Sequence, residues 1–268
     1  MTLNLIESVN SILSEVEDKS NKPIEFIEKE DLKTYAVVKI ARSSMPAHLI
    51  FYKKDHAELI NHLIAHECGH ILRTFGVPEA KRLIPMSYKD NRDRVIKDIS
   101  KDLKKLSSVV PAQKVDQLVD FWHRGIVQQI TSYPPDISIE KWIYDSYPEL
   151  RPYQLESIEK QKESSIAVLS NEVKMMVPRK IYNANNLMNY AFFNILGEHI
   201  GVDLVKPYNR TPYVKKGKKL VSLTKKEFVN TYEGDIEMTN HWAKFLNISG
   251  WFEWTSFENI PDNYLTSV

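Results

Sequence analysis

The segment LIAHECGHILRTF, residues 63–75, contains three side chains whose types and spacing suit metal-dependent hydrolysis. His66 and His70 are four residues apart, so on an α-helix both imidazoles lie on one face and can bind a single ion. Zinc accepts imidazole nitrogen, and at catalytic sites it takes three protein ligands and a water. Glu67 lies about 100° further around the helix, where its carboxylate can take a proton from that water. The pattern H-E-x-x-H thus predicts a zinc site with Glu67 as the catalytic base.

The surrounding sequence predicts a buried helix with defined ends. We expect Asp55 as the N-cap, with Glu58 three residues further on completing a capping box, and Gly76 as the C′ residue. Gly69 lowers helix propensity by about 1 kcal/mol relative to Ala, which a close approach of another segment would explain. Apolar residues surround the two histidines and keep water out of the site: these are Leu59, Leu63, Ile64, Ile71 and Leu72.

Two further residues of this helix receive other interpretations. His62 lies four residues before His66 and would lengthen the row of imidazoles, but we interpret it as a surface residue or as a hydrogen-bonding neighbour of the site. Cys68 lies two residues from His66 and therefore faces the far side of the helix, so we expect a buried, inert thiol.

The motif HECGH, on a helix preceded by predicted strands, resembles the zincin metallopeptidases. The metzincin pattern would place Gly at position 73 and His at position 76, where this chain has Arg73 and Gly76. Peptide deformylases need a separate Cys ligand, whereas the only Cys here, Cys68, lies inside the motif. The remaining resemblance is to the gluzincins, in which a Glu from a later helix completes the zinc site, and to their compact intracellular versions, the ImmA/IrrE-like proteins.

Glu140 is the predicted third zinc ligand. It lies in DISIEKWIYDSYPEL, residues 136–150, which predicts a short helix with Asp136 as the N-cap and Pro148 at its end. Asp136 lies four residues earlier on nearly the same face, where it can act as a partner for a metal-bound histidine. Two alternatives stay open: Glu172, in an Asn-Glu pair that resembles those of gluzincin ligands, and Asp136 itself.

Composition limits the classes of function. The 268 residues carry a net charge of +1, so no overall field attracts nucleic acid or a membrane. The single Cys excludes an intramolecular disulfide and fits a reducing compartment. Residues 1–20 predict an amphipathic helix with acidic side chains and lack the basic start and apolar core of a signal peptide. We therefore expect a cytoplasmic protein.

The order of predicted elements indicates an α+β fold. After the N-terminal helix, segments 22–28, 33–41 and 47–54 are rich in β-branched and aromatic residues and predict strands. The third strand leads directly into the metal helix, and we expect it to be an edge strand with which an extended substrate pairs. The predicted fold is a zincin-like core of N-terminal helix, small β-sheet and HExxH helix, followed by a mainly α-helical remainder.

Two domains are predicted. Residues 1–200 form the metallopeptidase domain with its helical second half, and residues 201–268 form a C-terminal subdomain. In the latter, the basic segment 206–228 predicts a hairpin or loop that turns at Lys216-Gly217, and aromatic-rich helices follow. Between an anion-binding hairpin and a solvated loop we favour the loop, because no stacking aromatic residues alternate with the lysines.

These features predict a zinc-dependent metallopeptidase, an intracellular endopeptidase whose partner is a peptide or protein substrate. Glu67 would deprotonate the zinc-bound water and then pass the proton to the leaving amine. The alternatives are a non-catalytic or regulatory zinc protein that binds partners, and a zinc amidohydrolase with a non-peptide substrate. The intact Glu67 argues against the first, because a structural site closes its fourth position and needs no base. The donor to the oxyanion stays open among Tyr144, Tyr147, His123 and Arg151.

Overall fold

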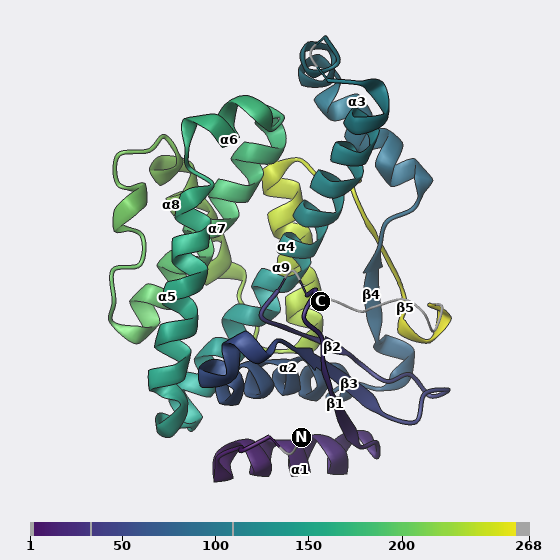
Figure 1. Cartoon of the computed structure of the whole chain (residues 1–268), viewed down its shortest axis with the longest axis vertical. Coiled ribbons are helices and arrows are strands. Elements are labelled where there is room, and N and C mark those ends of the chain that lie inside the picture. Colours follow the sequence, from purple (N-terminus) through teal and green to yellow (C-terminus); the bar gives the residue numbers. More distant parts are fainter. Residues whose placement is uncertain (1–2, 33, 109, 261–268) are drawn as a thin grey trace. The chain divides into compact units, whose positions relative to one another are not determined.

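The computed structural model describes residues 3–32, 34–108 and 110–260, and it has an α+β fold in which helices predominate (Figure 1). By contacts the chain divides into two compact units. The first unit contains the chain up to Ile84, Pro135–Glu159 and the residues from Thr255 onward, and the second contains Pro85–Pro134 and Lys160–Trp254. Both of the predicted domain ranges, 1–200 and 201–268, therefore contribute to each unit.

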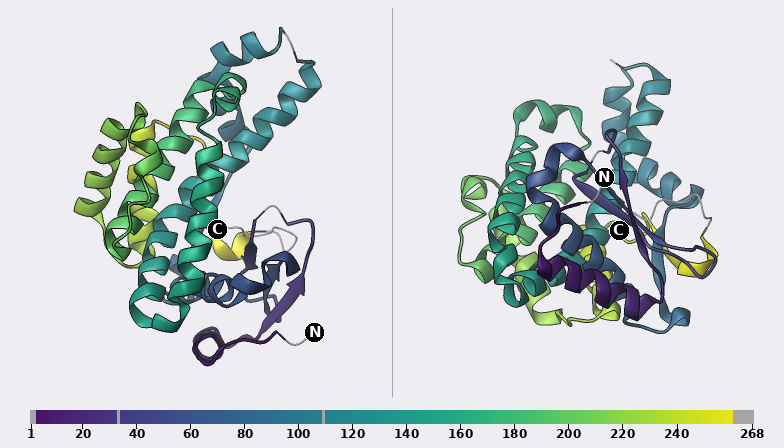
Figure 2. Two further views of the ribbon diagram at one scale, coloured as in Figure 1. Left: turned by 60° about the vertical axis from the view of Figure 1, so that its left-hand side comes forward. Right: turned by 60° about the horizontal axis from the view of Figure 1, so that its bottom comes forward.

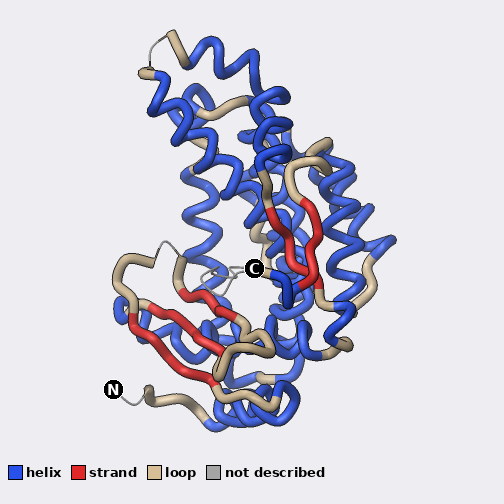
Figure 3. The backbone as a smooth tube through the Cα atoms, turned by 90° about the vertical axis from the view of Figure 1, so that its right-hand side faces the viewer, coloured by secondary structure: helices blue, strands red, loops and turns tan. Residues whose placement is uncertain are grey.

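The first unit starts with the predicted helix and three strands. Helix α1 (Glu7–Ser20) buries one apolar face. It packs against the later helix α2 (Ile60–Phe75), as Figure 2 shows. The strands β1 (Ile24–Glu28), β2 (Ala36–Lys39) and β3 (His48–Tyr52) follow. They form one sheet in the order β1-β3-β2, drawn in red in Figure 3.

The central position of β3 contradicts the expectation that segment 47–54 is an edge strand. Strand β3 pairs parallel with β1, with Ile24 opposite His48, and antiparallel with β2, with Ala36 opposite Tyr52. The edges of this sheet are therefore β1 and β2. This strand order could not be predicted from neighbouring residues, because β1 pairs with β3 and not with β2, the next strand in the chain.

Helix α2 (Ile60–Phe75), which carries the H-E-x-x-H motif, begins later than predicted. Residues Lys54–Leu59 form a 3₁₀-helix, and the N-cap of α2 is Leu59, which has no capping side chain, so Asp55 is not the N-cap of this helix as predicted. The helix ends at Phe75, and Gly76 follows as the C-cap. All five apolar residues expected around the histidines are buried.

A single long helix, α4 (Ala112–Ser146), contains most of the segment 136–150, for which a separate short helix was predicted. Proline lacks a backbone N–H and usually ends a helix, which is why Pro134 and Pro135 indicated a boundary. Here both prolines lie inside the helix, so the prediction of a short helix capped by Asp136 is wrong. Buried isoleucines on both sides of the prolines show that packing, rather than propensity, stabilises this helix: Ile126, Ile130, Ile137, Ile139 and Ile143.

The second unit is built mainly from helices. Its complete helices are α3 (Lys89–Leu106), α6 (Asn171–Met176), α7 (Arg179–Ile200), α8 (Tyr213–Glu227) and α9 (Tyr232–Leu246). The larger, N-terminal part of α4 and the C-terminal half of α5 (Arg151–Ala167) complete this unit. A further sheet pairs β4 (Leu83–Met86) with β5 (Glu253–Ser256). No described helix combines the length and apolar character that crossing a bilayer requires.

The basic segment near the C-terminus is a helix, which corrects the predicted hairpin or loop. Helix α8 makes up most of this segment and lies beside α7 (Figure 1). Gly217 is buried, and a Cβ there would clash with the ring of Tyr190 on α7. The Lys216-Gly217 pair therefore marks a close helix–helix contact and not a turn.

Candidate metal centre

Three donor atoms from α2 and α4 meet within the first unit. The Nε2 atoms of His66 and His70 are 3.3 Å apart, and Oδ1 of Asp136 lies 3.4 Å and 3.2 Å from them, respectively. Tetrahedral zinc with bonds of about 2.0–2.1 Å separates its ligand atoms by roughly 3.3–3.4 Å. The three measured separations therefore match one face of a zinc tetrahedron.

The carboxylate of Asp136 also has the chemistry of a cation ligand. Its Oδ1 atom is buried and makes no hydrogen bond with the described residues. Burial alone would raise the pKa of this carboxyl, but His66 and His70 lower it below its usual value, so Asp136 is an anion. A divalent cation would neutralise a buried anion that faces two imidazole nitrogens. The three side chains fit zinc.

Glu140 meets the other nitrogen of His66. Its Oε1 lies 2.7 Å from Nδ1 of His66, and its Oε2 lies 3.1 Å from Nε2 of His62. Although the donor atoms of these three residues also lie within 4.8 Å of one another, a separation of 2.7 Å is that of a hydrogen bond and is short for two ligands of one tetrahedral ion. The geometry favours Asp136 at the ion and Glu140 as the partner of His66, the reverse of the predicted roles.

Glu140 is held firmly in place. Gln154, on α5, donates from Nε2 to the carboxylate Oε2 of Glu140 at 2.5 Å and to its backbone carbonyl at 2.7 Å. Burial opposes ionisation of Glu140, but His62 and His66 lower the pKa of the carboxyl well below its usual range. Glu140 is therefore a buried carboxylate that accepts hydrogen bonds from three side chains.

The interpretation of His62 as a surface residue is wrong. Its exposed fraction is 2%, and it contacts Glu140 directly, as the alternative interpretation allowed. The signal in the sequence was the regular interval of four residues that joins His62, His66 and His70. Gln154 had no comparable signal, because it comes from a different helix with no motif around it.

Glu67 lies beside the histidines, as the motif predicts, and contacts the sheet. Its Oε2 accepts the backbone N–H of Val38 on β2 at 3.1 Å. Burial raises the pKa of Glu67, and the neighbouring Asp136 adds to this increase, while His66 and His70 oppose it. A raised pKa suits a carboxyl group that must take up a proton and release it again.

Other expectations about this helix hold. Cys68 is buried, and burial raises the pKa of its thiol, which makes it unreactive. The close approach that would explain Gly69 also exists, because a Cβ there would lie 2.6 Å from Cγ2 of Ile139 on α4.

The remaining candidates for ligand or oxyanion donor lie as follows. Glu172 is exposed on α6 in the second unit. His123 is buried in that unit and donates from Nε2 to the carbonyl of Trp251 at 2.6 Å. Arg151 donates to the carbonyl of Tyr144 at 2.8 Å and covers the ring of that residue. These contacts do not single out an oxyanion donor.

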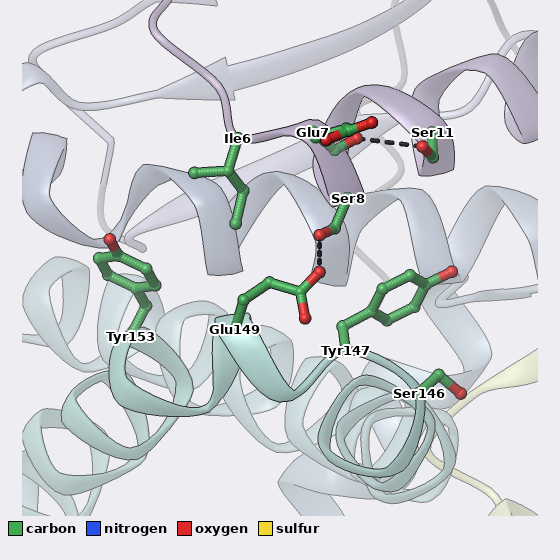
Figure 4. Close-up of a pocket in the computed structure, with 8 residues that line it drawn as sticks. All are labelled: Ile6, Glu7, Ser8, Ser11, Ser146, Tyr147, Glu149 and Tyr153. Atoms are coloured by element: carbon green, nitrogen blue, oxygen red, sulfur yellow. Dashed lines mark hydrogen bonds between the residues drawn. The ribbon is translucent and has the colours of Figure 1, made fainter.

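A separate pocket of about 680 Å³ lies beside the start of α1. Figure 4 shows Ser8 pointing at Glu149, to which it donates a hydrogen bond, with the rings of Tyr147 and Tyr153 on either side. The residues that line this pocket do not include His66, His70 or Asp136. The pocket is therefore distinct from the candidate metal centre.

Comparison of the chain with models of protein families, with curated proteins and with solved structures gives no match. Any functional assignment must therefore follow from the chemistry of the site.

Proposed function

We propose that the chain is a zinc-dependent metallopeptidase with a zincin-like core. In this proposal His66, His70 and Asp136 hold the ion, and Glu67 is the general base. The observation that carries the proposal is the triangle of donor atoms with sides of 3.2, 3.3 and 3.4 Å, formed by residues on two helices. Hydrolysis also requires a general base, and the carboxylate of Glu67, next to His66 in the sequence, can serve as one.

Each residue has a separate task. When bound, zinc lowers the pKa of a water ligand and polarises the substrate carbonyl. Glu67 accepts the proton of the attacking water and delivers it to the leaving amine. Its Oε2 is held by the N–H of Val38, which leaves Oε1 for proton transfer. Glu140 holds the proton of His66 on Nδ1, so the lone pair on Nε2 points toward Asp136 and His70.

The order of elements supports the zincin-like core. A helix, three strands and the H-E-x-x-H helix follow one another along the first unit. Strand β2, an edge of the sheet, is the strand that contacts Glu67. We infer an endopeptidase acting on peptides or proteins, and the single cysteine supports a cytoplasmic location.

Two measurements test this function. Metal analysis of the purified protein should find about one zinc per chain, and a fluorogenic peptide library should be cleaved by the wild type but not by Glu67→Gln. A protein without zinc, and without a thermal shift on adding zinc, would refute the proposal. A protein that holds zinc but cleaves no peptide would instead support the non-catalytic alternative.

A further inference from the structure

We propose that His62 and Gln154 are positioning residues that fix Glu140, and through it the orientation and tautomer of His66. This inference rests on the zinc site proposed above. The three helices α2, α4 and α5 each supply one part of the arrangement: His62 and His66 come from α2, Glu140 from α4 and Gln154 from α5.

The contact of His62 requires a particular proton arrangement. Oε2 of Glu140 also accepts from the amide of Gln154, so the nitrogen that faces this acceptor at 3.1 Å, Nε2 of His62, must carry a hydrogen. The other nitrogen of His62, Nδ1, is buried without a hydrogen bond among the described residues. Burying an imidazole with one unsatisfied nitrogen costs free energy, and the bond to the carboxylate compensates for this cost.

Gln154 restricts Glu140 more than a single hydrogen bond would. Its amide nitrogen bridges the side-chain Oε2 and the backbone carbonyl of the same residue, and Gln154 is fully buried. Because one amide nitrogen binds both the carboxylate and the backbone carbonyl of Glu140, rotation about the side-chain bonds of Glu140 is limited. Because Oε2 accepts from His62 and Gln154, Oε1 is directed to His66.

The tautomer of His66 depends on this arrangement. With a hydrogen on Nδ1 and a carboxylate holding it, Nε2 presents a lone pair to a metal ion. If Glu140 could rotate away, His66 would lose both the fixed ring orientation and the fixed tautomer. Loss of such a partner typically weakens metal binding about 10–100-fold.

Zinc affinity, measured by competition with a chromophoric chelator, tests the proposal without relying on activity. We expect His62→Leu and Gln154→Leu each to weaken zinc binding roughly tenfold, because Leu cannot donate to the carboxylate. His62→Gln should restore most of the affinity, since its amide can donate to Glu140. His48→Asn is the matched control, because His48 is also a fully buried histidine of the first unit but contacts Ala41 instead of Glu140. It should bind zinc within about twofold of the wild type.

A Glu140→Gln background distinguishes positioning from a general loss of structure. If His62 acts through Glu140, His62→Leu should have a much smaller effect on zinc affinity in that background. Equal effects in both backgrounds, or His62→Leu and Gln154→Leu proteins that bind zinc like the wild type, would overturn the proposal. If the His62→Leu protein does not fold in the presence of chelator, the zinc affinity of Gln154→Leu alone tests the proposal. An affinity equal to that of the wild type would then overturn it. A wild type that binds no zinc would refute the zinc site itself, which is a different result from unchanged affinity in the variants.

Discussion

Gly69 on α2 lies so close to Ile139 on α4 that a Cβ at residue 69 would be 2.6 Å from Cγ2 of Ile139. Gly69 is in the middle of a helix, so its role is to allow close packing and not an unusual backbone conformation. This contact sets the distance between the helix that carries His66 and His70 and the helix that carries Asp136. The first prediction follows from it.

Gly69→Ala should destabilise the protein, although alanine has the higher helix propensity. Overpacking a core typically costs about 1–3 kcal/mol, which exceeds the propensity gain of about 1 kcal/mol. Gly125→Ala is the control, because Gly125 is exposed on α4 with nothing within 4 Å of an added Cβ. That control should gain about 0.5–1 kcal/mol. Urea denaturation measures both changes, and equal gains would contradict the proposed steric role of Gly69.

Substitutions at the metal centre should fall into three classes of zinc affinity. His66→Ala, His70→Ala and Asp136→Ala should abolish tight binding, because each removes a proposed ligand. Glu140→Gln should weaken binding about 10–100-fold through the loss of its carboxylate from His66. Glu172→Ala should leave zinc affinity unchanged.

The same affinity measurements decide between the two carboxylates of α4. If Asp136→Ala kept tight zinc binding while Glu140→Gln abolished it, Glu140 would be the ligand, as the sequence alone predicts.

Glu67→Gln should retain zinc and lose hydrolysis. The amide keeps an oxygen that can accept the N–H of Val38, so the local structure should persist. The lost proton transfer should lower the cleavage rate by at least about 10²-fold. Metal analysis and peptide cleavage on the same preparation separate the two effects. Cleavage at the wild-type rate would remove Glu67 from the mechanism.

His48 should make the protein less stable in mild acid. It is fully buried, its Nδ1 accepts the N–H of Ala41 at 2.9 Å, and burial, with a smaller effect of Lys22, lowers its pKa from 6.5 to about 4. Above pH 6.5 both states are neutral at this residue. Between pH 6.5 and 4 the unfolded state binds the proton more strongly, so the free energy of unfolding falls as the pH falls.

The variant His48→Asn tests this pH dependence, because Asn keeps an acceptor for the N–H of Ala41 but does not titrate. Between pH 7.5 and 5, the wild type should lose about 2 kcal/mol more stability than the variant. Denaturation series in excess chelator at both pH values measure the difference. Parallel curves would show that His48 titrates normally in the folded protein.

The sequence predicted local geometry well. The positions of His66, Glu67 and His70 around one helix follow from their spacing, and the N-terminal helix and three strands were also predicted. Local geometry does not decide whether Asp136 or Glu140 is the third ligand of the proposed zinc site. They are four residues apart on one face of α4, so helical periodicity predicts the same direction for both side chains. Which one would reach a zinc ion in the proposed site depends on how far α4 is shifted along α2, and this packing is not local.

The errors in the fold have the same origin. The order of strands depends on pairing between β1 and β3, with β2 between them in the chain. Pro134 and Pro135 predict a helix end, but buried contacts override their propensity. Gly217 suggested a turn, whereas its lack of a side chain serves close packing against Tyr190. In each case a contact between distant segments decided the outcome.

The two halves of the proposed zinc site lie far apart along the chain, which would affect when zinc can bind. His66 and Glu140 are 74 positions apart. A chain still being synthesised, or one truncated before α4, carries both histidines of the motif without either carboxylate of α4. Two imidazoles alone make a weak and incomplete zinc site. In the proposed zinc site, tight zinc binding would therefore require that α4 has already docked against α2.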